Sequence, residues 1–189
     1  MSIRPLLTTA SKILVTSGDN LNGRQTTSEI VDLTVKGGNN CKNWPEFPVR
    51  LDGATGGLVG DTVIICGGFN GTANYALNDC YSLTSEKATL VTHMSVWRAS
   101  AASIVFNDNA LWVTGGSNHI VGLHASTEYV TITKTMPGPD LPMALEAHAM
   151  VAINSTCSMV IGGNSNEDEA NYCSFLFAMV KNSEYLLLF

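Results

Sequence analysis

Basic residues are scarce in this sequence, and it has no long apolar run. The 189 residues include 10 Lys and Arg against 16 Asp and Glu, a net charge of −6. Nucleic-acid surfaces need clustered Lys and Arg, so we expect no nucleic-acid partner. No apolar stretch approaches the about 18 residues of a membrane-spanning helix, so we expect no membrane span. Residues 1–7 lack the continuous apolar core of a clear signal peptide, which leaves cytoplasmic and secreted locations both open.

The motifs of the common enzyme classes are also missing. There is no Gly-x-Ser-x-Gly elbow, no His-Glu-x-x-His pair and no phosphate-binding loop. His119 and His124 lie close in the sequence, but no cysteine or clear carboxylate stands beside them as a further ligand. We therefore predict no catalytic residues, no metal site and no cofactor.

A short apolar run closed by two glycines is present, and it recurs. Val63–Ile65 precede Cys66, Gly67 and Gly68, and the pattern returns before Gly115–Gly116 and Gly162–Gly163. A weaker first copy ends at Gly18, with Ser17 in place of the first glycine. The second glycines stand at 18, 68, 116 and 163, so the intervals are 50, 48 and 47 residues. A fixed period of this length is typical of a repeat architecture, most often a propeller blade.

Each glycine pair is flanked by further short apolar segments. Upstream segments at 54–59, 99–106 and 147–153 are joined to the central run by clusters of turn-forming residues, which predicts a tight hairpin of strands a and b. A third segment, strand c, is expected at 28–33, 80–83, 127–132 and 173–177. A fourth, strand d, contains Trp44 in the first repeat, and Trp97 stands just beyond it in the second. The sequence therefore predicts an all-β fold with four strands per repeat.

The glycines and aromatic residues suggest how the repeats pack. Strand b is apolar on both faces, as expected for a strand covered on two sides. Glycines allow its end to bend or to approach a neighbour closely. Tyr81 and Tyr129 both stand 13 residues after their second glycine, and we expect an aromatic side chain of strand c or d, such as Tyr81, Tyr129 or Trp97, to lie over the glycine gap.

These features together resemble kelch repeats. The match consists of the Gly-Gly doublet, the following tyrosine, a tryptophan, and then elements such as Phe47–Pro48, Leu141–Pro142 and His148. It covers about residues 10–180, with departures at Ser17 and in repeats that lack the tyrosine or tryptophan. The resemblance implies a β-propeller of four-stranded blades whose loops bind a partner, usually a protein.

The number of blades is lower than in most members of that family, which commonly have six. This chain offers about four, at approximately 1–48, 49–97, 98–141 and 142–189, as one kelch-repeat domain spanning residues 1–189. An open arc would leave apolar blade faces exposed. We therefore expect a fragment or a truncated gene model, with an open arc or a four-bladed ring as the alternatives.

Loop lengths indicate which end of the blades binds. The a–b turns are short, whereas the b–c loops are long and polar and emerge at the same end as the d–a connections. Long loops on a rigid scaffold are where binding usually resides. The contact candidates on this face are Arg24, Asn70, Tyr75, His119, His124, Glu167 and Asp168. The alternative for each is an ordinary solvated loop residue.

Five cysteines are present, and two of them are expected to face each other. Cys66 ends strand b and Cys80 begins the antiparallel strand c, a placement compatible with a disulfide about 5.5 Å across. A buried free thiol at Cys66 is equally consistent with the sequence. Cys157 and Cys173 each begin their strands, so they should lie at opposite ends and not pair.

The function predicted from these features is a non-catalytic interaction module with a protein partner. Two alternatives stay open. One is a propeller enzyme or metal-dependent specifier protein, of the copper-oxidase or iron-dependent kind, although no convincing ligand set for either metal is seen. The other is the substrate-recognition fragment of a ubiquitin-ligase adaptor, although no BTB-like or F-box-like helical segment precedes Ile13.

Overall fold

The computed structural model describes residues 6–9, 12–21, 23–36, 41–71, 75–106, 109–154, 157–166, 176–180 and 185–188, with side chains between 12 and 166. In this part of the chain every regular element is a β-strand, in agreement with the all-β prediction. None of the described residues belongs to a helix long and apolar enough to cross a membrane.

The strands form four antiparallel sheets of four strands each, which we number in chain order. Sheet 1 consists of β1 (Leu6–Thr9), β2 (Lys12–Thr16), β5 (Ser28–Asp32) and β6 (Cys41–Trp44). Sheet 2 consists of β8 (Thr55–Val59), β9 (Thr62–Cys66), β11 (Asp79–Leu83) and β12 (Ala88–His93).

Sheets 3 and 4 repeat the same order of strands. Sheet 3 consists of β13 (Ala102–Phe106), β14 (Ala110–Thr114), β17 (Thr127–Val130) and β18 (Thr135–Pro137). Sheet 4 consists of β19 (Ala149–Ala152), β20 (Cys157–Ile161), β21 (Leu176–Val180) and β22 (Tyr185–Leu188). Spatial order follows chain order in every sheet, so the strands fill the predicted places a, b, c and d.

One strand, β1, was not predicted from the sequence. The first sheet has its own a–b hairpin, because Leu7 of β1 pairs with Ile13 of β2. In the fourth sheet, strand c is described from Leu176 to Val180, which overlaps the predicted 173–177. The predicted position of Cys173 lies outside the described residues.

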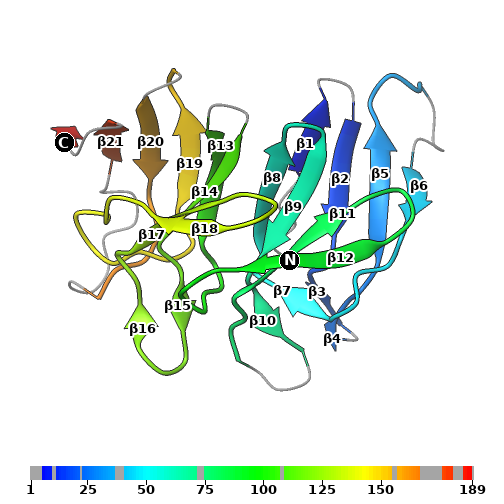
Figure 1. Ribbon diagram of the computed structural model, residues 1–189, viewed down its shortest axis with the longest axis horizontal. Helices are drawn as coiled ribbons and strands as arrows, with labels where there is room; N and C mark the ends of the chain where they lie inside the picture. Colours follow the sequence, from blue (N-terminus) through cyan, green and yellow to red (C-terminus); the bar gives the residue numbers. More distant parts are fainter. Residues whose placement is uncertain are drawn as a thin grey trace.

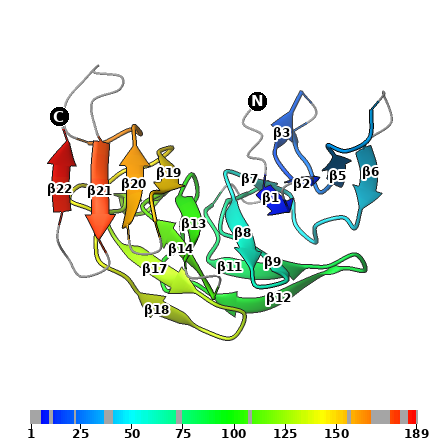
Figure 2. The same ribbon diagram turned by 90° about the horizontal axis from the view of Figure 1, so that it is seen from above.

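The four sheets are arranged side by side along an open arc (Figure 2). Three apolar clusters fill the spaces between them, and their central residues alternate between the two faces of each b strand. Ile65 faces sheet 1 with Leu14 and Phe47, whereas Ile64 faces sheet 3 with Leu111. Trp112 faces sheet 4 with Val160. Each inner sheet is therefore covered on both sides, as its apolar b strand predicts.

The two ends of the sheets differ in the length of their connections. The turns between strands a and b and between strands c and d lie at one end, which we call the turn face. The b–c loops and the d–a connections lie at the other end, which we call the loop face (Figure 1). The loops carry short ribbons of their own, β3 (Asp19–Asn20), β4 (Gly23–Arg24), β7 (Leu51–Asp52), β10 (Phe69–Asn70), β15 (Ser117–Asn118) and β16 (Gly122–Leu123).

The glycine doublets lie where strand b ends and the loop face begins. The first doublet residue has a left-handed backbone in every copy, with φ of +66° at Gly67, +58° at Gly115 and +64° at Gly162. Ser17 adopts the same conformation, with φ of +55°, which explains how the weaker first copy fits the pattern. Left-handed geometry favours glycine because it has no Cβ.

Tyr81 and Tyr129 stand equally far from their glycine doublets in the sequence, but they face opposite sides of their sheets. Tyr81 pairs with Ile65, three residues before the second glycine, but Tyr129 pairs with Trp112, four residues before it. A shift of one residue turns a side chain to the other face of a sheet. Tyr81 therefore packs edge-on against Phe47 towards sheet 1, whereas Tyr129 stacks on Trp112 towards sheet 4.

The expectation that Trp97 lies over a glycine gap is wrong. Its side chain is 48% exposed on the loop face. The space beside Gly67 is occupied by the backbone oxygen of Arg98 and the methyl group of Met94. A backbone carbonyl fits there because a Cβ on Gly67 would lie only 2.3 Å from it.

Two matched substitutions test the role of the doublet. A Cβ at Gly115 would lie 2.4 Å from the Leu145 oxygen, whereas a Cβ at Gly162 has nothing within 4 Å. We expect Gly162→Ala to lower the free energy of unfolding by about 1–2 kcal/mol, the cost of left-handed alanine. Gly115→Ala should cost about 1–3 kcal/mol more because of the clash. Equal losses in urea unfolding would contradict the proposed close contact.

Candidate functional site

The loop face is held together by backbone hydrogen bonds that recur in the first three repeats. The N–H groups of Gly18, Gly68 and Gly116 donate to the backbone oxygens of Leu51, Arg98 and Leu145 at 2.8, 3.0 and 2.7 Å. These three acceptors stand in the d–a connections that lead to the next sheet. Every such connection is therefore fastened to the glycine doublet of the sheet that it leaves.

The same connections also bond to the loop of the sheet that they enter. Asp52 pairs with Phe69, Ala99 with Ser117, and Glu146 with Asn164. Each d–a connection thus lies between two b–c loops and bonds to both of them. The loop face is a continuous hydrogen-bonded surface rather than a set of separate loops.

Arg24 and Asn70, two predicted contact residues, interact with each other. The Arg24 Nη1 donates to the Asn70 backbone oxygen at 3.1 Å, and the guanidinium lies 5.8 Å from the centre of the Phe69 ring. Both residues are half-buried. This contact joins the b–c loops of sheets 1 and 2, so the structure gives both residues a role in holding the loops in place.

Tyr75 and His119, two other predicted contact residues, are brought together from neighbouring sheets. Their ring centres lie 6.4 Å apart in a tilted arrangement. Trp97 and Ile120 join them around a hollow of about 520 Å³, whose remaining wall is residues 76–79. We call this the aromatic hollow. Tyr75 and Trp97 are 40% and 48% exposed.

His124 does not line the aromatic hollow. The Asn118 amide nitrogen is 2.8 Å from His124 Nε2, which makes Nε2 the hydrogen-bond acceptor. Burial lowers the pKa of His124, and the nearby positive charge of Arg98 lowers it further. The imidazole is therefore favoured in its neutral form. His124 serves to position the loop of sheet 3.

A buried ion pair beneath the hollow was not predicted from the sequence. Arg98 Nη2 lies 2.9 Å from Glu128 Oε1, and the two side chains are 0% and 3% exposed. Arg98 Nη1 also donates to the Gly115 and Ser126 oxygens at 2.6 and 2.8 Å. Burial lowers the pKa of Arg98, and the Glu128 carboxylate opposes this effect.

The carboxylate of Glu128 is saturated with further donors. Its Oε2 accepts from the Ser95 backbone N–H at 2.7 Å and from the Ser95 hydroxyl at 2.8 Å, and Oε1 accepts from the Val96 N–H at 3.2 Å. Because residues 95–98 form the connection that carries Trp97, the ion pair fixes this connection against sheet 3. Buried charges are tolerated when they are paired and hydrogen-bonded in this way.

A signal for Arg98 was present in the sequence. Leu51, Arg98 and Leu145 stand at intervals of 47 residues and make the same backbone bond to a glycine doublet. The two leucines are buried in apolar clusters, and Arg98 is equally buried. An arginine at a position otherwise filled by leucine would have indicated a buried charge that needs a carboxylate partner.

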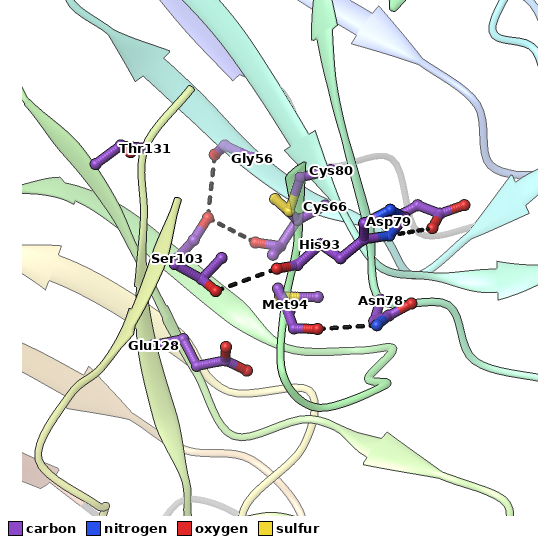
Figure 3. The surroundings of a disulfide bond; sticks show 12 residues. Gly56, Cys66, Asn78, Asp79, Cys80, His93, Met94, Ser103, Glu128 and Thr131 are labelled. Carbon is purple, nitrogen blue, oxygen red and sulfur yellow. Dashed lines mark hydrogen bonds and ion pairs between the residues drawn. A yellow bond between two sulfur atoms is a disulfide. The ribbon is translucent and has the colours of Figure 1, made fainter. Parts of the chain in front are cut away.

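Cys66 and Cys80 form a disulfide, which is one of the two states left open by the sequence. They are directly opposed on β9 and β11, and both side chains are buried between sheets 2 and 3. Figure 3 shows the bond next to Asn78, Asp79 and His93. The matching positions of sheet 1 are Thr16 and Ser28, whose hydroxyls hydrogen-bond to each other. The ends of strands b and c are thus linked by a disulfide in sheet 2 and by a hydrogen bond in sheet 1.

Asp79 connects this region to the outer strand. One carboxylate oxygen lies 2.9 Å from Nδ1 of His93, and the other accepts from the Tyr81 hydroxyl at 3.2 Å. Burial and the negative charge of Asp79 raise the pKa of Tyr81 to about 12. No group of three His, Cys, Asp or Glu that could hold a metal ion occurs among the described residues.

A second hollow, of about 640 Å³, lies at the turn face between sheets 1 and 2. Lys12, Lys42 and Asp32 line it together with Trp44 and Leu83. The hydroxyl and backbone N–H of Thr34 bond to the Asp32 carboxylate and lower its pKa. The other predicted contact residues, Glu167 and Asp168, lie outside the described residues.

The disulfide predicts a specific thiol count. Denatured protein should expose two more thiols after reduction than before it, as counted by alkylation and mass spectrometry. Reduction should also destabilise the fold by about 3 kcal/mol, since the bond closes a loop of 14 residues in sequence. Cys41→Ser, at an exposed free cysteine, serves as the control and should leave the thiol difference at two. No difference would show that Cys66 is a free thiol.

The ion pair predicts a strong double-mutant coupling. Arg98→Leu and Glu128→Gln should each cost about 3–5 kcal/mol, because either change leaves one buried charge without its partner. The double variant should be less destabilised than the sum, with a coupling of about 1–3 kcal/mol in urea unfolding. Arg50→Leu, at an exposed arginine in the preceding connection, should change stability by less than about 0.5 kcal/mol. Additive losses would rule out a direct pair.

Comparison with known proteins gives the fold and no more. No family model and no curated protein matches the chain. The chain is similar to the solved structure of YjhT, with a TM-score of 0.78 and 14% sequence identity. The match covers 98% of this chain and 65% of that one, so this chain spans about 65% of the length of YjhT. The chain therefore shares the overall arrangement of sheets seen in YjhT.

Proposed function

We propose that this chain is a kelch-type propeller domain with four blades, near 1–48, 49–97, 98–141 and 142–189, that acts as a non-catalytic protein-interaction module. The four-stranded antiparallel sheets, packed face to face along an arc, support the propeller reading. The glycine doublets and the recurring connection between sheets support the kelch resemblance. The loop face is the binding surface.

The aromatic hollow is the observation on which this function rests. Tyr75, Trp97 and Ile120 expose large apolar surfaces, and they converge from two b–c loops and one d–a connection. Exposed aromatic residues around a depression are typical of protein-binding hot spots. Burying them in water-free contact would stabilise a complex, whereas leaving them in water has no benefit for the folded chain.

Exposed apolar residues occur at the turn face as well, but they are not gathered in the same way. Leu33, Ile132 and Ile153 each belong to a turn of a different sheet. Single exposed apolar side chains are normal on protein surfaces. The turn-face hollow is lined by none of the large apolar side chains that are exposed among the described residues, whereas the hollow of the loop face is lined by three of them, Tyr75, Trp97 and Ile120.

Site-specific photocrosslinking from the two faces tests the proposal. Benzoylphenylalanine is placed at Val121 on the loop face or at Ile132 on the turn face, which are 71% and 47% exposed. We expect the Val121 protein to form one reproducible adduct with a protein from its source cells, and Trp97→Asp to abolish that adduct. The Ile132 protein should form none.

Two results would overturn the proposal. Adducts that form equally from both faces, or that survive Trp97→Asp, would show that the loop face is not a specific surface. Circular dichroism of each variant confirms that the sheets are intact, because both labelled positions are exposed and should tolerate the change.

A further inference from the structure

The residues that line the aromatic hollow indicate which kind of chemical group it binds. Its rings come from Tyr75, Trp97 and His119, and Ile120 completes the apolar rim. The tilt of 47° between the Tyr75 and His119 rings spreads them apart rather than stacking them. Ring faces that are not stacked on each other are available to a flat or cationic group from outside.

The hollow has an acidic residue in its wall, and the carboxylate of that residue, Asp79, already lies 2.9 Å from His93 Nδ1 and accepts from the Tyr81 hydroxyl at 3.2 Å. A carboxylate has lone pairs for further donors. Among its eight lining residues Asp79 is the only acidic one, and none is Lys or Arg. The nearby Arg98 does not offset this charge, since Glu128 neutralises it at 2.9 Å in the interior. The chain as a whole also has a net charge of −6. An anionic ligand would therefore be repelled, and a cationic one attracted.

The rim of the hollow is held in a fixed geometry by Asn118. The amide nitrogen of this buried side chain donates to the Trp97 backbone oxygen at 3.0 Å. Its oxygen accepts from the N–H groups of Ile120 and Val121 at 2.9 and 2.8 Å. One side chain thus ties the connection that carries Trp97 to the loop that carries His119. A site that is already ordered loses less entropy when it binds.

We propose that the aromatic hollow binds the side chain of an arginine presented by a basic segment of the partner protein. This inference rests on the proposed interaction function and names the chemistry of the partner. A guanidinium is planar, stacks on aromatic rings and can donate to a carboxylate at its edge. Tyr75 and Trp97 supply the rings, and Asp79 supplies the negative charge. A lysine fits less well, because its ammonium is compact and strongly hydrated.

Small probes test this without a known partner. N-acetyl-arginine amide, its neutral isostere N-acetyl-citrulline amide and N-acetyl-glutamate amide are titrated into the full chain. Binding is followed by the indole N–H resonance of Trp97 in ¹⁵N NMR, assigned with Trp97→Phe. We expect saturable binding of the arginine probe, about three- to tenfold weaker binding of citrulline, and no binding of glutamate.

Matched variants locate the binding site. Tyr75→Leu keeps an apolar side chain but removes the ring, and it should weaken arginine binding about three- to tenfold. Leu21→Ala, in the loop of sheet 1, removes an exposed apolar side chain away from the hollow and should leave binding unchanged. An unchanged dispersion of the remaining indole signals shows that each variant is folded.

The results separate this inference from the proposed function. Equal binding of arginine and citrulline, or binding of neither, would overturn the arginine site. If the Val121 adduct still depends on Trp97, the interaction function then stands with a different occupant. If the arginine probe binds as expected but no adduct forms, the site stands and the protein-interaction function fails.

Discussion

One type of backbone hydrogen bond, from the last glycine after strand b in the first three repeats to the connection that leaves the sheet, organises this protein. It occurs at Gly18, Gly68 and Gly116 with lengths of 2.7–3.0 Å. The φ values of +111°, +98° and +89° at these positions are those that glycine adopts without strain. A Cβ at Gly116 would meet the Ala99 oxygen at 2.7 Å. At Gly68 and Gly116 the missing Cβ therefore also leaves room for the connection that enters the sheet, whereas a Cβ at Gly18 would have nothing within 4 Å.

The glycine hydrogen bond decides what can be buried and what must be exposed. It directs the side chains of Leu51, Arg98 and Leu145 into the core, all at most 1% exposed. In the connection that leaves sheet 2 this position is Arg98, and its charge is paired with that of Glu128. The residue before Arg98 then emerges on the surface as Trp97. Burial of an arginine and exposure of a tryptophan are consequences of the same chain path, and together they create the rigid side of the aromatic hollow.

The sequence predicted the repeated elements well because their signals are local. An apolar run, a turn and a glycine pair each report on a few adjacent residues, and strands such as Thr62–Cys66 lie where those signals place them. Strand register was predicted less well. The loop between the paired ends of strands b and c differs by one residue between sheets 2 and 3, since Cys66 pairs with Cys80 and Thr114 pairs with Thr127. That difference puts Tyr81 and Tyr129 on opposite faces despite their equal spacing.

The candidate site was predicted only in part, because local signals place loop residues but do not show which residues of neighbouring sheets meet. Tyr75 and His119 were predicted as contact residues from loop position alone, and the structure brings them together. Trp97 was assigned to packing because tryptophan is large and apolar, but its exposure depends on the path of the connection. Arg98, Glu128 and Asn118 act through contacts with residues 21–33 positions away, such as Trp97, Glu128 and Ser95. Such pairs follow from the stacking of sheets and not from any local pattern.

Hydrogen exchange of the glycine amides tests the central claim most directly. The amides of Gly18, Gly68 and Gly116 leave strand b and face the loop side, where an amide without a partner would exchange quickly. If each donates to a connection carbonyl, its protection under native conditions should approach that of core strand amides such as Val113. Exchange as fast as that of the exposed turn amide of Ser85 would show that the connections are not fastened to the glycines, and the account given for the loop face would be wrong.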